Sequence, residues 1–228
     1  MFSFYLFISA KQKKQRLQTY IDWIKHHGAS RNIQIFTSDF LKGMLFLNLR
    51  EETLEEKIIY NGKIITLSRD RVELPNGKEA IREVISHPGG VGIVALTDSG
   101  EVLMVNQYRY PYRSELLEIP AGKLSPGENP LECGKRELCE ETGATACEYQ
   151  SLGRLYPTAG YANEIIYLYL AKNLTIGKQQ PDEDEFLDVV KLPLKKAVEM
   201  VMSGELVDAK TQIALLKTWF LINGSELL

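Results

Sequence analysis

The spacing of apolar residues changes along this chain, and the changes mark its predicted elements. From about residue 55, apolar residues alternate with polar ones between turn sequences such as Asn61-Gly62 and Pro75-Asn76-Gly77, which is typical of β-strands. Predicted strands span residues 57–60, 63–74, 79–86, 91–97, 101–109, 115–119, 149–156, 164–171 and 185–191, and predicted helices 130–142, 194–202 and 211–222. This order predicts an α+β fold, with a mixed sheet between helices.

The predicted helix over residues 130–142 has favourable ends and an acidic face. Pro130 suits a first helical turn and Gly143 suits a helix stop. Glu137, Glu140 and Glu141 fall within roughly a third of the helix circumference. Three neighbouring carboxylates repel one another unless a cation lies between them, and Mg²⁺ binds through a few carboxylates plus substrate phosphates. A solvated acidic face is the alternative for an arbitrary Glu-rich helix.

The acidic face belongs to a longer pattern that decides between these alternatives. The seven fixed positions are Gly122, Glu128, Arg136, Glu137, Glu140, Glu141 and Gly143. At about 7% usage each, seven identities recur by chance about once in 10⁸ windows. They resemble the signature of the Nudix hydrolases, Gly-x5-Glu-x7-Arg-Glu-U-x-Glu-Glu-x-Gly-U, with Leu138 and Ala144 at the aliphatic positions U. The resemblance implies a Nudix-like α/β/α sandwich, preceded here by an N-terminal β-hairpin region.

The resemblance also implies a metal site. The expected ligands are Glu137, Glu140, Glu141 and the backbone carbonyl of Ala121, for two or three Mg²⁺ ions that Mn²⁺ could replace. Glu141 is counted among the catalytic residues as well.

The other residues of the signature have supporting roles. Arg136 is expected to take part in catalysis by orienting a glutamate through a charge-assisted hydrogen bond. For Glu128, two roles are equally open: hydrogen bonds that hold the loop together, and an outer-shell role at the metal site. Gly122 is expected to allow close approach of the backbone, and Gly143 is expected to end the helix.

Three further stretches look like the ADP-ribose pyrophosphatase branch of these enzymes. They are residues 105–111 with 118–123, residues 82–89, and residues 156–164. One departure is Ala159, where this branch usually has a proline. The resemblance to diphosphate hydrolases is therefore stronger than the resemblance to enzymes acting on ADP-ribose itself.

These stretches supply the remaining candidate residues. Arg109 fits a phosphate clamp, since a guanidinium meets phosphate oxygens bidentately, although a strand-end ion pair is the alternative. Glu118 is expected near the metals or the ribose, with a structural role as its alternative. Arg82 and Glu83 match a pair that contacts adenine or ribose, often across a dimer interface, but neighbours on a strand point to opposite faces.

The expected general base is Glu164, which follows a glycine-containing loop and could instead be a further metal ligand or an ordinary strand-start residue. His87 precedes a Pro-Gly-Gly turn and is expected to be structural. Residues 182–185 are expected to form a solvated acidic turn.

The predicted activity is Mg²⁺-dependent hydrolysis of a nucleoside diphosphate sugar, foremost ADP-ribose to AMP and ribose 5-phosphate. The closest alternatives are other Nudix substrates, namely a GDP-sugar, a dinucleoside polyphosphate or NADH. An alternative of a different class is a non-catalytic module that senses ADP-ribose. Such modules commonly lose the signature glutamates, all of which are present here.

Composition limits the partners. The net charge of −3 and a pI near 5.8 argue against a general nucleic-acid or membrane-surface binder. The three cysteines show no CxxC spacing, so a disulfide framework or zinc site is not expected and a cytoplasmic location fits best. The family resemblance implies a homodimer with exchanged N-terminal strands.

The expected domain organisation has three parts: an extension over residues 1–43 outside the catalytic fold, N-terminal strands over 44–90 that serve dimerisation, and a Nudix hydrolase domain over 91–228. Residues 1–43 differ from the rest because they hold seven Lys/Arg against two Asp.

Deleting residues 1–43 should leave both activity and dimerisation intact, because the signature and its supporting stretches all lie further along the chain. Turnover and analytical ultracentrifugation of the shortened protein check this expectation. Loss of either property would reject it.

Overall fold

The computed structural model describes residues 22, 49–181 and 185–224. The predicted extension over 1–43 lies outside these described residues, apart from Asp22. The chain forms two compact units, one built from residues up to Glu55 with Arg71–Ile81, the other from Glu56–Asp70 with Arg82–Leu228. The predicted division at residues 44, 90 and 91 stays a prediction. Among the described residues, no helix has the length and apolar character to cross a bilayer.

The first sheet has four strands. They are β1 (Glu52–Glu55), β2 (Ile58–Asn61), β3 (Thr66–Glu73) and β4 (Glu79–Ser86). Both β1 and β2 pair antiparallel with β3, and β4 pairs with β3 as well. The strand β4 has the predicted bounds. The strand β1 was not predicted, because its Glu-Thr-Leu-Glu sequence is too short and polar to show an alternating pattern.

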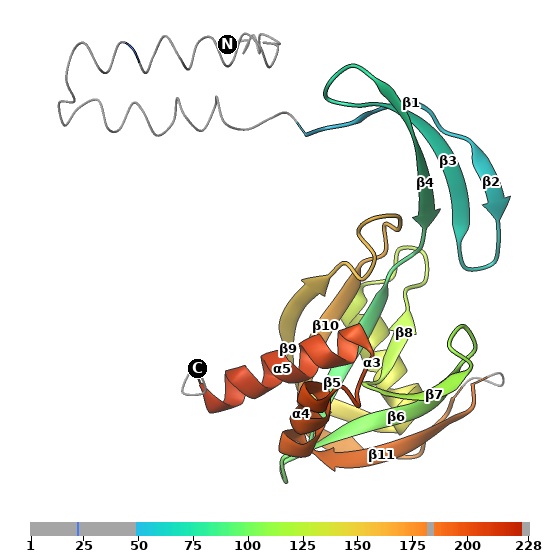
Figure 1. Ribbon diagram of the computed structural model, residues 1–228. Helices are drawn as coiled ribbons and strands as arrows, with labels where there is room; N and C mark the ends of the chain where they lie inside the picture. The colour runs from blue at the N-terminus through green and yellow to red at the C-terminus, as the bar shows by residue number, and fades with distance from the viewer. Residues whose placement is uncertain (1–21, 23–48, 182–184, 225–228) are drawn as a thin grey trace, which may run out of the picture. The chain divides into compact units, whose positions relative to one another are not determined.

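The second sheet has seven strands and mixed directions (Figure 1). The strand order is β11-β6-β5-β10-β9, with β7 on β6 and β8 on β5. The bounds are β5 Gly90–Leu96, β6 Glu101–Arg109, β7 Ser114–Glu118, β8 Ala121–Lys123, β9 Ala144–Leu155, β10 Ile166–Ile176 and β11 Leu187–Pro193. β10 runs parallel to β5 and antiparallel to β9. The mixed sheet was predicted, whereas β8 was missed.

Helices cover the two faces of this sheet, as the side chains of β5 show. Val91 and Ile93 pack with Cys133 and Leu138 of helix α3 (Pro130–Thr142). Val94, which alternation places on the other face, packs with the helices α4 (Leu194–Ser203) and α5 (Ala209–Asn223). In Figure 1 the red helix α5 lies in front of β5, and α3 lies behind the sheet. The predicted α/β/α sandwich is thereby confirmed.

The ends of α3 lie at the predicted residues. The side chain of Asn129 accepts hydrogen bonds from the backbone N–H groups of Leu131 and Glu132, which caps the helix start. At the other end Gly143 has φ of 71°, and a Cβ there would lie 2.6 Å from the carbonyl oxygen of Gly177. Only glycine meets both constraints, so the helix stops where the signature requires.

Leu215 on α5 is fully buried in the core that α4 and α5 form with the sheet. Leu215→Ala should therefore lower the free energy of unfolding by about 2 to 5 kcal/mol, from lost burial and the remaining cavity. Urea unfolding measures this loss. Ile213→Ala is the control, because Ile213 lies on the same helix with 37% of its surface exposed and should cost clearly less. Equal losses in both variants would contradict the assignment of the core.

Candidate active site

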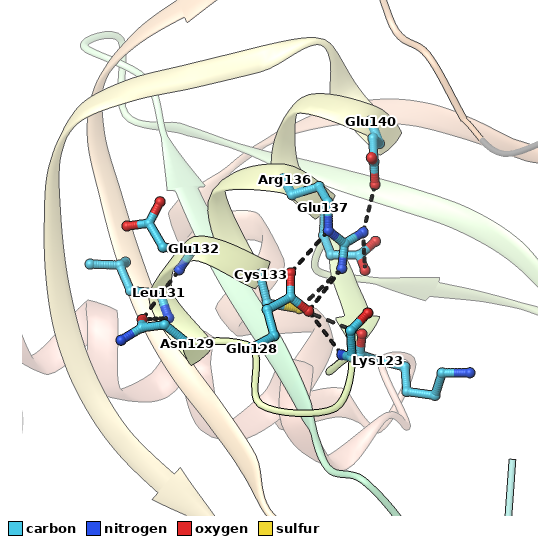
Figure 2. Close-up of polar contacts among 10 residues, drawn as sticks. Lys123, Glu128, Asn129, Leu131, Glu132, Cys133, Arg136, Glu137 and Glu140 are labelled. Atoms are coloured by element: carbon cyan, nitrogen blue, oxygen red, sulfur yellow. Dashed lines mark hydrogen bonds and ion pairs between the residues drawn. The ribbon is translucent and has the colours of Figure 1, made fainter.

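Arg136 lies among the carboxylates of the signature (Figure 2). Its Nη1 is 2.9 Å from Glu137 Oε1 and 2.8 Å from Glu140 Oε2, and its Nε is 3.2 Å from Glu128 Oε1. These ion pairs hold the side chains of α3 and of the loop before it in one arrangement. Arg136 therefore supplies the positive charge that the acidic face of the helix requires.

Glu128 closes the loop between β8 and α3. Its Oε2 accepts a hydrogen bond of 2.9 Å from the backbone N–H of Ser125, while both of its oxygens accept from Arg136. The guanidinium and the N–H lower the pKa of this carboxyl below its ordinary value. Of the two roles left open by the sequence, these contacts favour loop-tying.

The short strand β8 lies directly against the buried carboxylates of α3. Glu137 and Glu141 are only 7% and 2% exposed. A Cβ on Gly122 would lie 1.8 Å from Glu137 Cδ, which no side chain could tolerate. The backbone N–H of Ala121 donates a 2.9 Å hydrogen bond to Glu141 Oε2. The glycine of the signature thus makes room for a carboxylate.

Burial changes the protonation of these two glutamates. Loss of water raises the pKa of Glu137 to about 7 and that of Glu141 to about 8. The negative charge of Glu185 raises both pKa values further. Residues 182–184 of the predicted acidic turn lie outside the described residues, and the influence of Glu185 on the buried pair was not predicted.

Oxygen donors next to buried charge are what a hard divalent cation prefers, so Glu137, Glu141 and the Ala121 carbonyl fit Mg²⁺ chemically. Within the part of the chain that the structure describes, no three His, Cys, Asp or Glu side chains form a ready metal-binding group. Arg136 accounts for part of this, since it binds the carboxylates of Glu137 and Glu140.

A cleft of about 220 Å³ lies beside β8. Its lining residues are His87, Gly89, Gly90, Val91, Arg109, Ala121, Gly122, Lys123, Glu164, Ile166 and Lys210. Three of these side chains carry fixed positive charge, and Glu164 carries negative charge. The cleft therefore brings the predicted residues Arg109, Ala121, Gly122 and Glu164 together. Arg82 and Glu83 are not among its lining residues.

Arg109 forms a bidentate pair with Glu118. Its Nε and Nη2 donate to Glu118 Oε1 and Oε2 at 2.7 and 2.8 Å. Glu118 is 1% exposed, and it also pairs with Lys210. Burial alone would raise the pKa of Glu118, but the two cations outweigh burial and lower the pKa below its ordinary value. Glu118 is therefore ionised and held by both cations.

Glu164 lies at the cleft next to His87, with Oε1 3.4 Å from His87 Nδ1. The same Nδ1 accepts a hydrogen bond of 3.0 Å from the backbone N–H of Gly89. His87 and Glu164 therefore lie side by side in the wall of the cleft. His87 was expected to be structural, and its place in the cleft wall was not predicted.

The predicted nucleotide-binding pair lies on β4, where Arg82 is half-buried and Glu83 is exposed. Adjacent strand positions point to opposite faces, as expected. Lys210 was missed because an isolated lysine carries no motif, and Lys123 lies in a matching stretch but was given no role. Only the fold brings them beside Arg109.

Comparison with known proteins shows the family of the chain that carries this site. The family described as NUDIX domain matches residues 86–211, more than half of the chain. The chain belongs to the Nudix family. A second family, the nucleoside diphosphate sugar hydrolase N-terminal domain, matches residues 51–85 of this Nudix hydrolase. The family resemblance, the fold class and the enzyme class predicted from the sequence are confirmed.

Curated relatives cover most of this Nudix hydrolase. ADP-ribose pyrophosphatase of Bacillus subtilis (strain 168) is 44% identical over 170 residues, covering 74% of this chain and 92% of the relative. Methanol dehydrogenase activator of Bacillus methanolicus is 41% identical, covering 75% and 92%. A solved structure described as ADP compounds hydrolase matches with a TM-score of 0.67 and 22% identity, over 77% of this chain and 96% of that one. That structure supports the fold alone.

The buried Glu141 predicts how stability depends on pH. The folded protein keeps a proton on Glu141 up to about pH 8, whereas the carboxyl has an ordinary pKa of 4.5. The unfolded chain releases this proton earlier, so stability without metal should fall as pH rises through this window. Glu141→Gln should reduce this dependence and leave the part that the raised pKa of Glu137 contributes, and thermal unfolding in EDTA between about pH 5 and about pH 8 measures it.

Glu132→Gln provides the control, because Glu132 lies exposed on the same helix. This variant should keep the wild-type dependence. An unchanged pH dependence in Glu141→Gln would contradict the raised pKa.

Proposed function

We propose that this Nudix hydrolase cleaves the diphosphate of a nucleoside diphosphate sugar, foremost ADP-ribose, to give AMP and ribose 5-phosphate. One observation carries the proposal: buried carboxylates of α3 and a cleft lined by cations meet at β8. The acidic side suits divalent metal, and the cationic side suits a dianionic diphosphate. The relative named ADP-ribose pyrophosphatase, which matches over 92% of its length, supports this substrate.

Mg²⁺ is the proposed cofactor, held by Glu137, Glu140, Glu141 and the carbonyl of Ala121. When bound, the metal supplies a Lewis acid for the phosphate oxygens and lowers the pKa of a bound water. The structure supports the ligand assignment through the burial of Glu137 and Glu141 and the contact with Gly122. Arg136 is a positioning residue, because its ion pairs fix Glu137 and Glu140 on the helix.

The other residues of the cleft have roles in binding and proton transfer. Arg109 neutralises charge on the diphosphate, since two of its five N–H donors bind Glu118 and the side chain still lines the cleft. Glu164 accepts the proton of the attacking water.

A homodimer is part of the proposal. Large apolar side chains are exposed on β2 and beside it, including Ile58, Tyr60 and Ile64 at more than half of their surface. Exposed apolar residues grouped on one short strand are typical of surfaces that bind another protein. Arg82 and Glu83 on β4 would then contact the nucleotide from the N-terminal strands, as the sequence predicted.

Glu137→Gln tests the metal assignment and should lower kcat by two or more orders of magnitude, because a neutral amide holds a divalent cation poorly. The assay measures Mg²⁺-dependent phosphate-ester release from ADP-ribose, GDP-mannose, NADH and diadenosine polyphosphates. Wild type should turn over ADP-ribose with the highest kcat/KM.

Glu132→Gln is the matched control, since Glu132 lies on the exposed side of the same helix and pairs with Lys135. Its turnover should equal that of wild type, and both variants should keep the Tm near the wild-type value. Near-normal turnover in Glu137→Gln would reject the metal assignment. A wild-type protein that binds ADP-ribose without hydrolysing it would reject the enzymatic function.

A further inference from the structure

We propose that Lys210, near the start of α5, is a substrate-binding residue that contacts the diphosphate together with Arg109. The inference rests on the proposed function and extends it to a helix that carries no residue of the Nudix signature. Lys210 lines the same cleft as Arg109 and Gly122. It therefore adds a fixed positive charge to those of Arg109 and Lys123 where the diphosphate would lie.

The position of Lys210 is unusual for a lysine. Its side chain is only 11% exposed, whereas lysine is almost never deeply buried unless it is paired. Here it pairs with Glu118 Oε2 and, at 3.0 Å, with Asp208 Oδ2. These partners explain why the charge is tolerated beneath the surface. They do not by themselves explain why a cation lies at this wall of the cleft.

The N–H donors of the Lys210 ammonium group explain its position. An ammonium group has three N–H donors, and Glu118 accepts one of them, while Asp208 contributes an ion pair at 3.0 Å. The remaining donors belong to a group that lines the cleft, so they are available to a phosphate oxygen. Arg109 is in the same situation, because Glu118 accepts two of its five donors. Both cations thus keep N–H donors for an anion, while Glu118 holds the two side chains in place.

Hydrogen bonds at the start of α5 fix Lys210 in place. The carboxylate of Asp208 accepts from the backbone N–H of Thr211 at 2.9 Å and from its hydroxyl at 2.6 Å. The same hydroxyl accepts a 3.0 Å hydrogen bond from the backbone N–H of Ile119, the residue after Glu118. Thr211 is fully buried. These contacts link Glu118, Lys210, Asp208, Thr211 and Ile119 in a ring. The ring holds the ammonium group of Lys210 in place before substrate binds.

Glu118 acquires a positioning role in this arrangement. Its two oxygens accept from Arg109 and Lys210, so it sets the separation of the two cations. Asp208 adds a second negative charge from the N-cap position of α5. The four side chains sum to no net charge, so each cation at this wall of the cleft is balanced by a carboxylate.

The test uses four proteins: wild type, Lys210→Met, Glu118→Gln and the double variant. The measurements are kcat and KM for ADP-ribose, and inhibition constants for AMP and adenosine. Lys210→Met should raise the inhibition constant of AMP and lower kcat/KM for ADP-ribose by about 10- to 100-fold, the effect of one charge-assisted hydrogen bond. Adenosine carries no phosphate, so its inhibition constant should stay within about threefold.

The Glu118→Gln background separates direct contact from an effect through Glu118. If Lys210 touches phosphate, Lys210→Met weakens AMP binding in this background too. If Lys210 acts only by holding Glu118, the substitution is silent there and the proposal is wrong. The double variant leaves Arg109 and Asp208, whose charges sum to zero, so it avoids the uncompensated negative charge that Lys210→Met alone creates.

Lys217→Met is the matched control on the same helix. Lys217 donates a 2.6 Å hydrogen bond to the carbonyl of Leu152 and is not among the residues that line the cleft. Its kinetic constants should equal those of wild type. Equal weakening of AMP and adenosine by Lys210→Met, or normal kcat/KM, would overturn the role of Lys210. Failure of wild type to hydrolyse any sugar nucleotide would instead overturn the proposed function.

Discussion

The close contact between Gly122 and Glu137 determines the arrangement of the rest of the site. A carboxylate packed against a strand backbone, with its neighbour Glu141 almost fully buried, loses much of its hydration. Such groups are costly as anions unless a cation compensates them. This loss of hydration occurs where α3 packs against β8. The same constraint explains the glycine and the close approach of the strand.

The protein's own cations balance the acidic residues on both sides of this contact. Arg136 binds Glu128, Glu137 and Glu140 on the helix, while Arg109 and Lys210 bind Glu118 at the cleft. Removing one partner of such a pair leaves an uncompensated charge, which costs more than the pair itself contributes. The two ion-pair groups therefore compensate the buried charges without ligands and also define where ligands of opposite charge fit.

The sequence predicted those parts of the molecule whose causes are local. Pro130, Asn129 and Gly143 determine the ends of α3 through hydrogen bonds and backbone conformation within a few residues, so its bounds were predicted to the residue. β8 has three residues and no alternation, and it exists because β5 offers it hydrogen bonds. The acidic face of α3 was recognised from spacing alone. Lys210 and Glu185 reach the site only through tertiary structure, which no local pattern reveals.

The parallel pairing of β5 with β10 has a consequence for folding. Parallel strands begin at the same edge of a sheet, so the segment before β5 and the segment before β10 lie together, and Asn163 Oδ1 accepts a hydrogen bond from the backbone N–H of His87. Segments so distant along the chain must lose considerable loop entropy before they meet. The cleft consequently exists only in the completed tertiary structure, and no early local fragment of the chain contains a substrate site.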